Sequence, residues 1–486
     1  MYRRAVTRIL YIGLLVFGLL FLQLNSQIVL EPPQASPTSP PTKYSLTQNV
    51  GDTRSFWAND FDTATHYEID ATLLAIGEHC LIYFQDSLIS LLGQEEATSR
   101  CESYRNEFDD VIYPKVTELT GNPDGRIGDV DGDPRIIILI SDNLMSYYSQ
   151  YNEIVSTYSN LCEMVYIYYD NYLILDTIAH EFCHLIWFNY EFDEVHFILE
   201  GMAEYATYYV GYLSYRGNVS HRTDYFLQTP DDSLIYFDVA QKDYGGSYLF
   251  AFYLAERFGV QFLTELVQQE EDGALGIEAA LLDAGHNISF NELYLDWVTA
   301  ITIDELGFAD NNYGFANMDV QFQELTVRNT IPVEIESLSI RYYGAEIIKI
   351  TNPPDNFTVA ISQPDMGCTG VSIVYHDSDG WFVQKNALGS PILENVTGNS
   401  IDTLYVITSL LFSEASAGNI DFGEGVSDEV DIAITEHSPS EPSTTSGLVP
   451  AEWTPFIVTL GISSLVVPII VAIIVIRKRQ NVSETI

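Results

Sequence analysis

The chain has 486 residues and a formal net charge of −47, from 68 Asp and Glu against 21 Lys and Arg. This acidic excess disfavours nucleic-acid binding, which needs basic patches that neutralise phosphates. It would attract cationic peptides and keep the surface solvated. The chain is also too long for one hydrophobic core, so more than one domain is expected.

The first 30 residues have the pattern of a secretory signal. Three arginines precede an apolar run over residues 9–24, as in the basic and hydrophobic regions of a signal peptide. No clear small-residue cleavage site follows, so residues 1–30 are expected to be either a cleaved signal peptide or a signal anchor. Residues 31–43 are rich in Pro, Ser and Thr and predict an extended linker.

The five cysteines bear on the compartment. Cys80 and Cys101 are a candidate disulfide pair, which would suit an oxidising environment outside the cell. Because the number of cysteines is odd, at least one thiol is expected to be free.

An acidic loop comes before a strongly apolar run. Asp129, Asp131 and Asp133 form a D-x-D-x-D pattern, whose alternate carboxylates are typical calcium ligands. The glycine and final glutamate of an EF-hand are missing, so both a calcium site and a metal-free turn capped by Asp remain open. The run 135–141 is nearly all Ile and Leu and predicts a buried strand.

The motif H-E-x-x-H lies at His180, Glu181 and His184, in a mostly apolar stretch that predicts a helix. Residues four apart share one face of a helix, so both imidazoles can bind one metal ion. Glu181 lies one step round the helix, where its carboxylate can hold a water bound to that metal.

A second predicted helix supplies another pair at the same spacing, Glu200 and Glu204. A catalytic zinc site needs a third protein ligand and one open position, and Glu200 is predicted to be that ligand. Glu204 is then placed to orient a ligand histidine. Gly201 would let the two predicted helices that carry the ligands approach closely.

The H-E-x-x-H motif followed by Glu200-Gly201-Met202-Ala203-Glu204 resembles the gluzincin zinc metallopeptidases, and most closely their peptidase-MA-like or hyicolysin-like branch. Segments at 129–140, 244–259 and 290–297 resemble the same branch. The resemblance implies an α+β, thermolysin-like catalytic domain at 44–325, with a mixed β-sheet part followed by a helical part. It also implies bound Zn²⁺, a peptide or protein substrate, and Glu181 as general base.

The resemblance further implies a Tyr or His that stabilises the oxyanion of the tetrahedral intermediate. The candidates are Tyr244, Tyr248 and His221, and Tyr244 is favoured because it precedes a Gly-Gly pair in the family-like segment. An edge strand that pairs with extended substrate is also implied. Either 135–141 or 164–169 is expected to be that strand.

The C-terminal part has a different character. Short predicted strands separated by Gly, Pro, Asn and Asp turns indicate a β-sandwich at 326–436. A Ser-, Thr- and Pro-rich stalk follows at 437–454. Residues 455–476 carry no charge and are long enough to span a bilayer. The basic tail 477–486 is expected in the cytoplasm by the positive-inside rule.

Together these features predict a membrane-anchored extracellular zinc endopeptidase with a single membrane span. The alternative is a non-catalytic adhesion or envelope protein that retains a peptidase-like domain. The intact set of His180, Glu181, His184 and Glu200 favours the enzyme. An aminopeptidase is disfavoured because no G-x-M-E-N-type segment for binding a free amine is present.

Overall fold

The computed structural model describes most of the chain between residues 48 and 436. The described residues are 48–61, 63–123, 130–143, 145–213, 219–323, 325–362, 368–389, 392–412 and 427–436. Five predicted segments lie outside them: 1–30, 31–43, 437–454, 455–476 and 477–486. Among the helices of the described residues, none combines the length and apolar character needed to cross a membrane.

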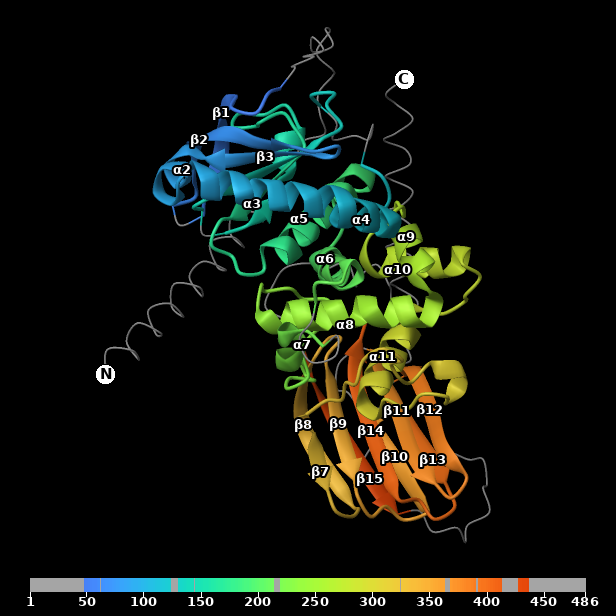
Figure 1. Ribbon diagram of the computed structural model, residues 1–486. Helices are drawn as coiled ribbons and strands as arrows, with labels where there is room; N and C mark the ends of the chain where they lie inside the picture. Colours follow the sequence, from blue (N-terminus) through green and yellow to red (C-terminus); the bar gives the residue numbers. More distant parts are fainter. Residues whose placement is uncertain are drawn as a thin grey trace, which may run out of the picture. The chain divides into compact units, whose positions relative to one another are not determined.

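A six-stranded mixed sheet forms the N-terminal part (Figure 1), in the order β1-β2-β3-β4-β6-β5. Its strands are β1 (Thr53–Asp60), β2 (Thr65–Ile76), β3 (Cys80–Gln85), β4 (Ile136–Ser141), β5 (Tyr147–Tyr148) and β6 (Met164–Tyr168). Strands β3, β4 and β6 are parallel, whereas β1, β2 and β5 pair antiparallel. All six residues of β4 are buried, as the unbroken Ile and Leu run predicts.

The edge strand differs from the prediction. Strand β4 lies inside the sheet, and β6 is covered on its outer side by β5. The edge is therefore β5, which pairs Tyr147 with Tyr166 and Tyr148 with Val165. Both ranges named for the edge, 135–141 and 164–169, were wrong. A two-residue strand carries no alternating pattern that would reveal it.

The opposite edge of the sheet is closed by side chains. The backbone N–H of Trp57 in β1 donates to Asn160 Oδ1 at 2.8 Å, and Asn160 Nδ2 donates to the Trp57 carbonyl at 2.9 Å. The N–H of Asn59 donates to the Tyr147 hydroxyl at 2.9 Å, and Asn143 Nδ2 donates to the Asn59 carbonyl at 3.0 Å. These bonds satisfy backbone groups that an edge strand usually leaves open.

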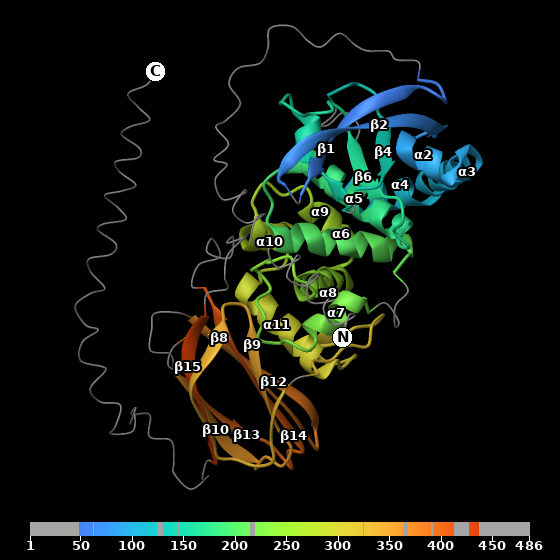
Figure 2. The same cartoon turned by 90° about the vertical axis from the view of Figure 1, so that its left-hand side faces the viewer.

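One group of helices lies in the chain between β3 and β4, and the remaining helices follow β6. They are α2 (Asp86–Leu92), α3 (Gln94–Glu107), α4 (Tyr113–Thr120), α5 (Ile174–Tyr190), α6 (His196–Val210), α7 (His221–Phe226), α8 (Gln241–Phe258), α9 (Val260–Leu266), α10 (Gly273–Asp283) and α11 (Phe290–Ile303). A π-helical segment, Phe108–Ile112, joins α3 to α4. Figures 1 and 2 both show α8 and α11 between the sheet and the C-terminal strands.

The C-terminal strands form two facing sheets, in the orders β13-β10-β15-β8 and β12-β11-β14-β9-β7. The strands are β7 (Thr326–Arg328), β8 (Val333–Arg341), β9 (Ala345–Ile350), β10 (Asn356–Ser362), β11 (Cys368–Asp377), β12 (Gly380–Gly389), β13 (Ile392–Thr397), β14 (Thr403–Leu411) and β15 (Ser427–Glu436). Apolar side chains from both sheets, including Phe357, Ile373 and Val406, meet in one core. The described residues thus combine helices with one mixed sheet and two mainly antiparallel sheets, which is consistent with the α+β class.

The two-sheet part shares a second core with the helices. Tyr343, Ile347 and Ile407 from the strands belong to the same buried cluster as Phe290 and Trp297 of α11. The Tyr343 hydroxyl and Asn291 Oδ1 of α11 are 2.6 Å apart. This part of the molecule is therefore packed onto the helices as continuous interior and is not joined to them by a tether alone.

Three glycines allow α6, α7 and α8 to approach closely. Gly201 was expected to bring α6 close to α5, but a Cβ on Gly201 would lie 2.6 Å from the Ser247 carbonyl oxygen, so the close approach is to α8 instead. A Cβ on Gly245 would lie 2.2 Å from the Arg222 carbonyl oxygen, whereas one on Gly246 would lie 2.8 Å from the Phe226 ring. Neither site has room for a side chain while α7 keeps its place.

The candidate disulfide is not formed. Cys80 and Cys101 are free, buried thiols, and Cys80 Sγ lies 3.8 Å from Asp109 Oδ1. Burial, with the nearby Asp109 charge, raises the pKa of Cys80, and burial raises the pKa of Cys101 to about 12. Sequence spacing alone could not show that the two thiols serve as small apolar core residues.

We expect Gly245→Ala to cost more stability than Gly246→Ala. The first methyl meets rigid backbone and should lower the free energy of unfolding by about 2–3 kcal/mol, whereas the second meets a movable ring and should cost about 1 kcal/mol. Urea unfolding of both variants checks this order. Equal losses would contradict the role assigned to the α7–α8 contact.

Candidate metal centre

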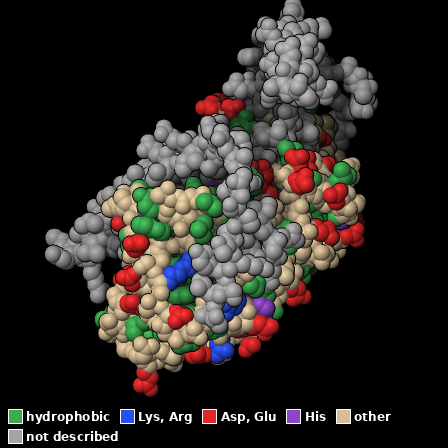
Figure 3. Space-filling model, turned by 90° about the horizontal axis from the view of Figure 1, so that it is seen from above, with side chains coloured by type: hydrophobic (Ala, Val, Ile, Leu, Met, Phe, Trp, Pro, Cys, Tyr) green, Lys and Arg blue, Asp and Glu red, His purple; other side chains and the backbone are tan. Residues whose placement is uncertain are grey.

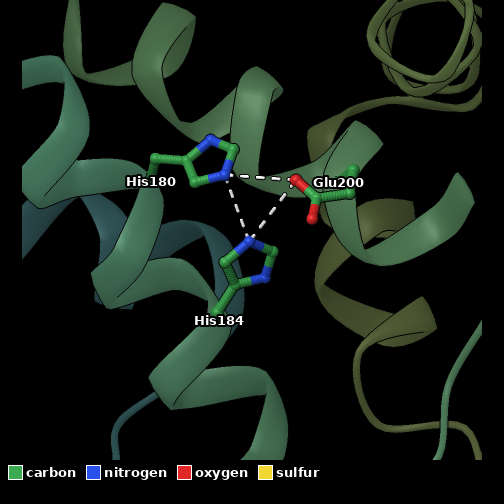
Figure 4. Close-up of side chains that lie close together, drawn as sticks. All are labelled: His180, His184 and Glu200. Atoms are coloured by element: carbon green, nitrogen blue, oxygen red, sulfur yellow. Dashed lines mark hydrogen bonds and ion pairs between the residues drawn. The ribbon is translucent and has the colours of Figure 1, made fainter. Parts of the chain in front are cut away.

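Helices α5 and α6 carry the predicted ligands to one point. The apolar face of α5 is buried through residues such as Ile178, Phe182 and Trp187. The side chains of His180 and His184, one turn apart, therefore face α6 at the edge of this core, where Glu200 meets them (Figure 4). The helical spacing of the motif and the packing of α6 together place three donor atoms side by side.

The distances between the donor atoms match a tetrahedral metal site. His180 Nε2 and His184 Nε2 are 3.1 Å apart. Glu200 Oε2 lies 3.2 Å from the first and 3.5 Å from the second. Tetrahedral coordination with bonds of about 2.0–2.1 Å separates neighbouring donor atoms by about 3.3–3.4 Å. Two imidazoles and one carboxylate therefore fit a divalent ion and leave its fourth position open.

The ligands are partly buried and interact electrostatically with one another. Their side chains are 14–15% exposed. Burial acts to lower the pKa of His180, but the hydrogen bond and charge of Glu200, with those of Glu181 and Glu204, raise it to about 9. Burial acts to raise the pKa of Glu200, but the two histidines hold it well below its usual range. A positive charge is thus strongly favoured at this point.

Glu181 lies beside the ligands and reaches the edge strand. It is buried, and burial raises its pKa, against the charges of His180 and His184. The backbone N–H of Tyr148 in β5 donates a hydrogen bond to Glu181, which acts to lower that pKa. The carboxylate predicted as general base is therefore held between the donor atoms and the end of the sheet.

Glu204, predicted to orient a ligand histidine, lies beside His180, and Arg222 is a partner that sequence reasoning missed. Glu204 Oε1 lies 3.5 Å from His180 Nδ1, the ring atom that does not face the other donors. Arg222 Nη1 of α7 donates to the same carboxylate. Burial acts to lower the pKa of Arg222, but the charges of Glu204, Tyr244 and Glu200 raise it. Its only sequence signal is a cation in a very acidic chain.

Among the three candidates for the oxyanion donor, Tyr244 has the surroundings that suit the role best. Its ring is half-buried, and the Arg222 guanidinium lies 4.2 Å from the ring centroid. Burial and the charges of Glu200, Glu204 and Glu181 raise its pKa well above the usual value. Tyr248, by contrast, is fully buried in α8, and His221 is exposed at the start of α7.

The acidic loop contains an internal ion pair. Asp133 accepts hydrogen bonds from Arg135 Nε at 2.8 Å and Nη2 at 2.6 Å. Asp131 Oδ1 accepts from the backbone N–H of Asp133 at 2.8 Å. Asp129 lies outside the described residues. The described part of the loop has the geometry of a turn capped by Asp.

A second group of carboxylates was not predicted. Oxygen atoms of Glu191, Asp193 and Asp272 lie within 4.8 Å of one another. Burial and a hydrogen bond with Asp193 raise the pKa of Glu191 to about 8. This raised pKa favours a proton on Glu191 at neutral pH.

Comparisons with known proteins give no family. No family model matches the chain, and no curated protein matches it. Among solved structures, the crystal structure of Yersinia pseudotuberculosis-derived mitogen matches 24% of this chain and 100% of its own, with 12% identity and a TM-score of 0.16. Such a TM-score carries no argument about fold or function.

We expect metal binding at this site to release a proton. The pKa of His180 is raised to about 9, so at pH 7 an ion must displace the proton from its imidazole. Affinity for Zn²⁺, used as the test ion with a competing chelator, should rise about tenfold per pH unit up to about pH 9 and then level off. Affinity that stays constant from pH 7 to 9 would contradict this assignment.

Proposed function

We propose that this protein is a zinc-dependent endopeptidase, anchored in the membrane with its catalytic part outside the cell. The observation that carries the proposal is the convergence of His180, His184 and Glu200 beside Glu181. The uncharged run 455–476 and the basic residues after it support the anchor. The scarcity of basic side chains on the face in Figure 3 agrees with a chain that does not bind nucleic acid.

Zinc is the ion that this donor set suits best. Two neutral imidazoles and one carboxylate in tetrahedral array, with a fourth position open, are typical of catalytic zinc and not of calcium, which prefers six to eight oxygens. A bound zinc ion would polarise the scissile carbonyl and lower the pKa of a bound water to about 7. Glu204 would orient His180 through the ring nitrogen that it faces.

Glu181 is the proposed general base. Its carboxylate is adjacent to the ligand histidines in α5 and is fixed by the Tyr148 N–H. Burial raises its pKa, which makes it a better proton acceptor than a solvated glutamate. It would take the proton from the attacking water and deliver it to the leaving amine.

Tyr244 is the proposed donor to the oxyanion that forms at the scissile carbonyl. The hydroxyl is protonated at neutral pH even at the ordinary tyrosine pKa of about 10, and here its pKa is raised further, so it can donate a hydrogen bond. Arg222 packs on the ring of Tyr244 and donates to Glu204, so it links the donor to the ligand shell.

The edge strand β5 is the proposed docking element for substrate. It lies at the end of the sheet, and the N–H of Tyr148 contacts Glu181. An extended peptide that pairs with β5 by backbone hydrogen bonds would present its amide bonds close to the base. Pairing through the backbone suits an endopeptidase, because it needs no free chain terminus.

Glu181→Gln tests the mechanism. The amide keeps the size of the side chain but cannot accept the water's proton, so cleavage of unfolded casein should fall by about three orders of magnitude or more, while one zinc per chain is retained. Activity and zinc content are measured on residues 44–436. Glu200→Gln is the matched control, and it should lose zinc as well as activity. Full activity in Glu181→Gln would contradict the mechanism. A wild type that binds zinc but cleaves no substrate would favour an adhesion protein.

Tyr244→Phe tests the oxyanion donor. Removing one donor from an oxyanion site costs about 10²–10³ in kcat, so kcat should fall in that range while KM and zinc content stay unchanged. Tyr225→Phe, which alters an exposed tyrosine of α7, is the control and should leave kcat unaltered. A change confined to KM would assign Tyr244 to substrate binding instead.

A further inference from the structure

We propose that Arg341, in the C-terminal strand part of the chain, is a positioning residue for Tyr244. This inference rests on the proposed function and extends it to a residue about a hundred positions away. Arg341 holds the segment that leads into α8 and so fixes the first turn of that helix, where Tyr244 lies. The two-sheet part would thus serve the reaction and not only the stability of the chain.

The turn between β8 and β9 is hydrogen-bonded to residues 230–234. The N–H of Leu234 donates to the Tyr343 carbonyl at 2.9 Å, and the N–H of Ala345 donates to the Pro230 carbonyl at 2.8 Å. The Ser233 hydroxyl donates to the Tyr342 carbonyl at 2.6 Å. These backbone bonds join the two segments as firmly as a short stretch of sheet.

The approach is close enough to require a glycine. A Cβ on Gly344 would lie 2.3 Å from the carbonyl oxygen of Asp231. No side chain fits there unless the two segments separate. The contact is therefore built into the backbone path of the β8–β9 turn.

A cluster of charged side chains connects this contact to the start of α8. Asp232 is 6% exposed, and its Oδ1 accepts from Arg341 Nη1 at 2.6 Å and from Lys242 Nζ at 2.5 Å. A buried carboxylate is stable as an anion only when such partners compensate its desolvation. Lys242 is the second residue of α8, two positions before Tyr244. Asp232 thus ties the strand part and the start of α8 to one anchoring point.

The segment between Asp232 and Tyr244 is also fixed on the side of the metal centre. The Phe237 ring packs edge-on against Tyr244, with centroids 4.9 Å apart, and lies 6.0 Å from the ring of His196 at the start of α6. Asp243 Oδ2 accepts from the N–H groups of Asp238 and Ala240, both at 2.9 Å. The chain between them holds Val239 at a φ of 66°, a strained value for a β-branched residue.

Such strain persists only where the surroundings impose it. Arg341 and Lys242 hold the segment at Asp232, and Asp243 holds it at the helix start, so the position of Tyr244 depends on both ends. A displacement of about 1 Å at a catalytic group can cost about 100-fold in rate. Loosening the Asp232 end should therefore reduce kcat without removing any group that contacts substrate.

Arg341→Gln tests this proposal, with Arg328→Gln in β7 as the matched control. The Arg341 side chain is 42% exposed, so the variant should still fold. Amide hydrogen exchange should quicken in peptides covering 235–244 in Arg341→Gln only. The value of kcat should fall about 10- to 100-fold, with KM and zinc content unchanged, and Arg341→Lys should recover much of the loss.

A double-mutant cycle with Tyr244→Phe decides between positioning and general stability. If Arg341 acts through Tyr244, its replacement should cost little further kcat once the hydroxyl is gone. Fully additive losses, or unchanged exchange at 235–244, would overturn the proposal. Amide hydrogen exchange does not depend on activity. A wild type that cleaves no substrate would refute the proposed function. The exchange measurement alone would still decide whether Arg341 holds the start of α8.

Discussion

Two imidazole nitrogens and one carboxylate oxygen held within 3.1–3.5 Å of one another are the constraint on which the remainder of the structure depends. The carboxylates of Glu200, Glu181 and Glu204 favour a positive charge in this partly buried group, since they raise the pKa of His180 to about 9. Such an arrangement persists only if the two helices that carry it cannot relax apart. The surrounding packing provides that rigidity, with α5 against the sheet and α6 against α8.

The rigidity is built from close contacts that admit no side chain. Gly201 brings α6 against Ser247, and Gly245 brings α7 against α8. The same packing delivers Arg222 to Glu204 and to the ring of Tyr244. Side chains of the two-sheet part complete the core under α11, so the layer that holds the site is supported from both sides.

Sequence predicted the part of the site that local geometry determines. The i,i+4 spacing within two helices places His180 with His184 and Glu200 with Glu204, whatever the remaining chain does. Arg222 and the Tyr148 N–H were missed because they reach the site through tertiary packing. The same limit applies to β5, which is too short to have a sequence pattern. It also applies to Cys80 and Cys101, which are buried as free thiols by the way in which β3 and α3 pack. The α+β class was implied by the family resemblance, and the helices and sheets of the described residues are consistent with it.

The closed edge of β1 has a consequence for how the sheet meets other polypeptides. At Trp57 and Asn59, a passing chain would have to displace hydrogen bonds from Asn160, Tyr147 and Asn143 before it could pair. At β5 it meets the end of the sheet directly beside Glu181. If the protein cleaves unfolded chains as proposed, one closed edge would suppress unproductive encounters, since a segment captured on the wrong side would compete with the productive one. Under the proposed function, Asn143 and Asn160 would thereby favour turnover without contacting the reacting atoms.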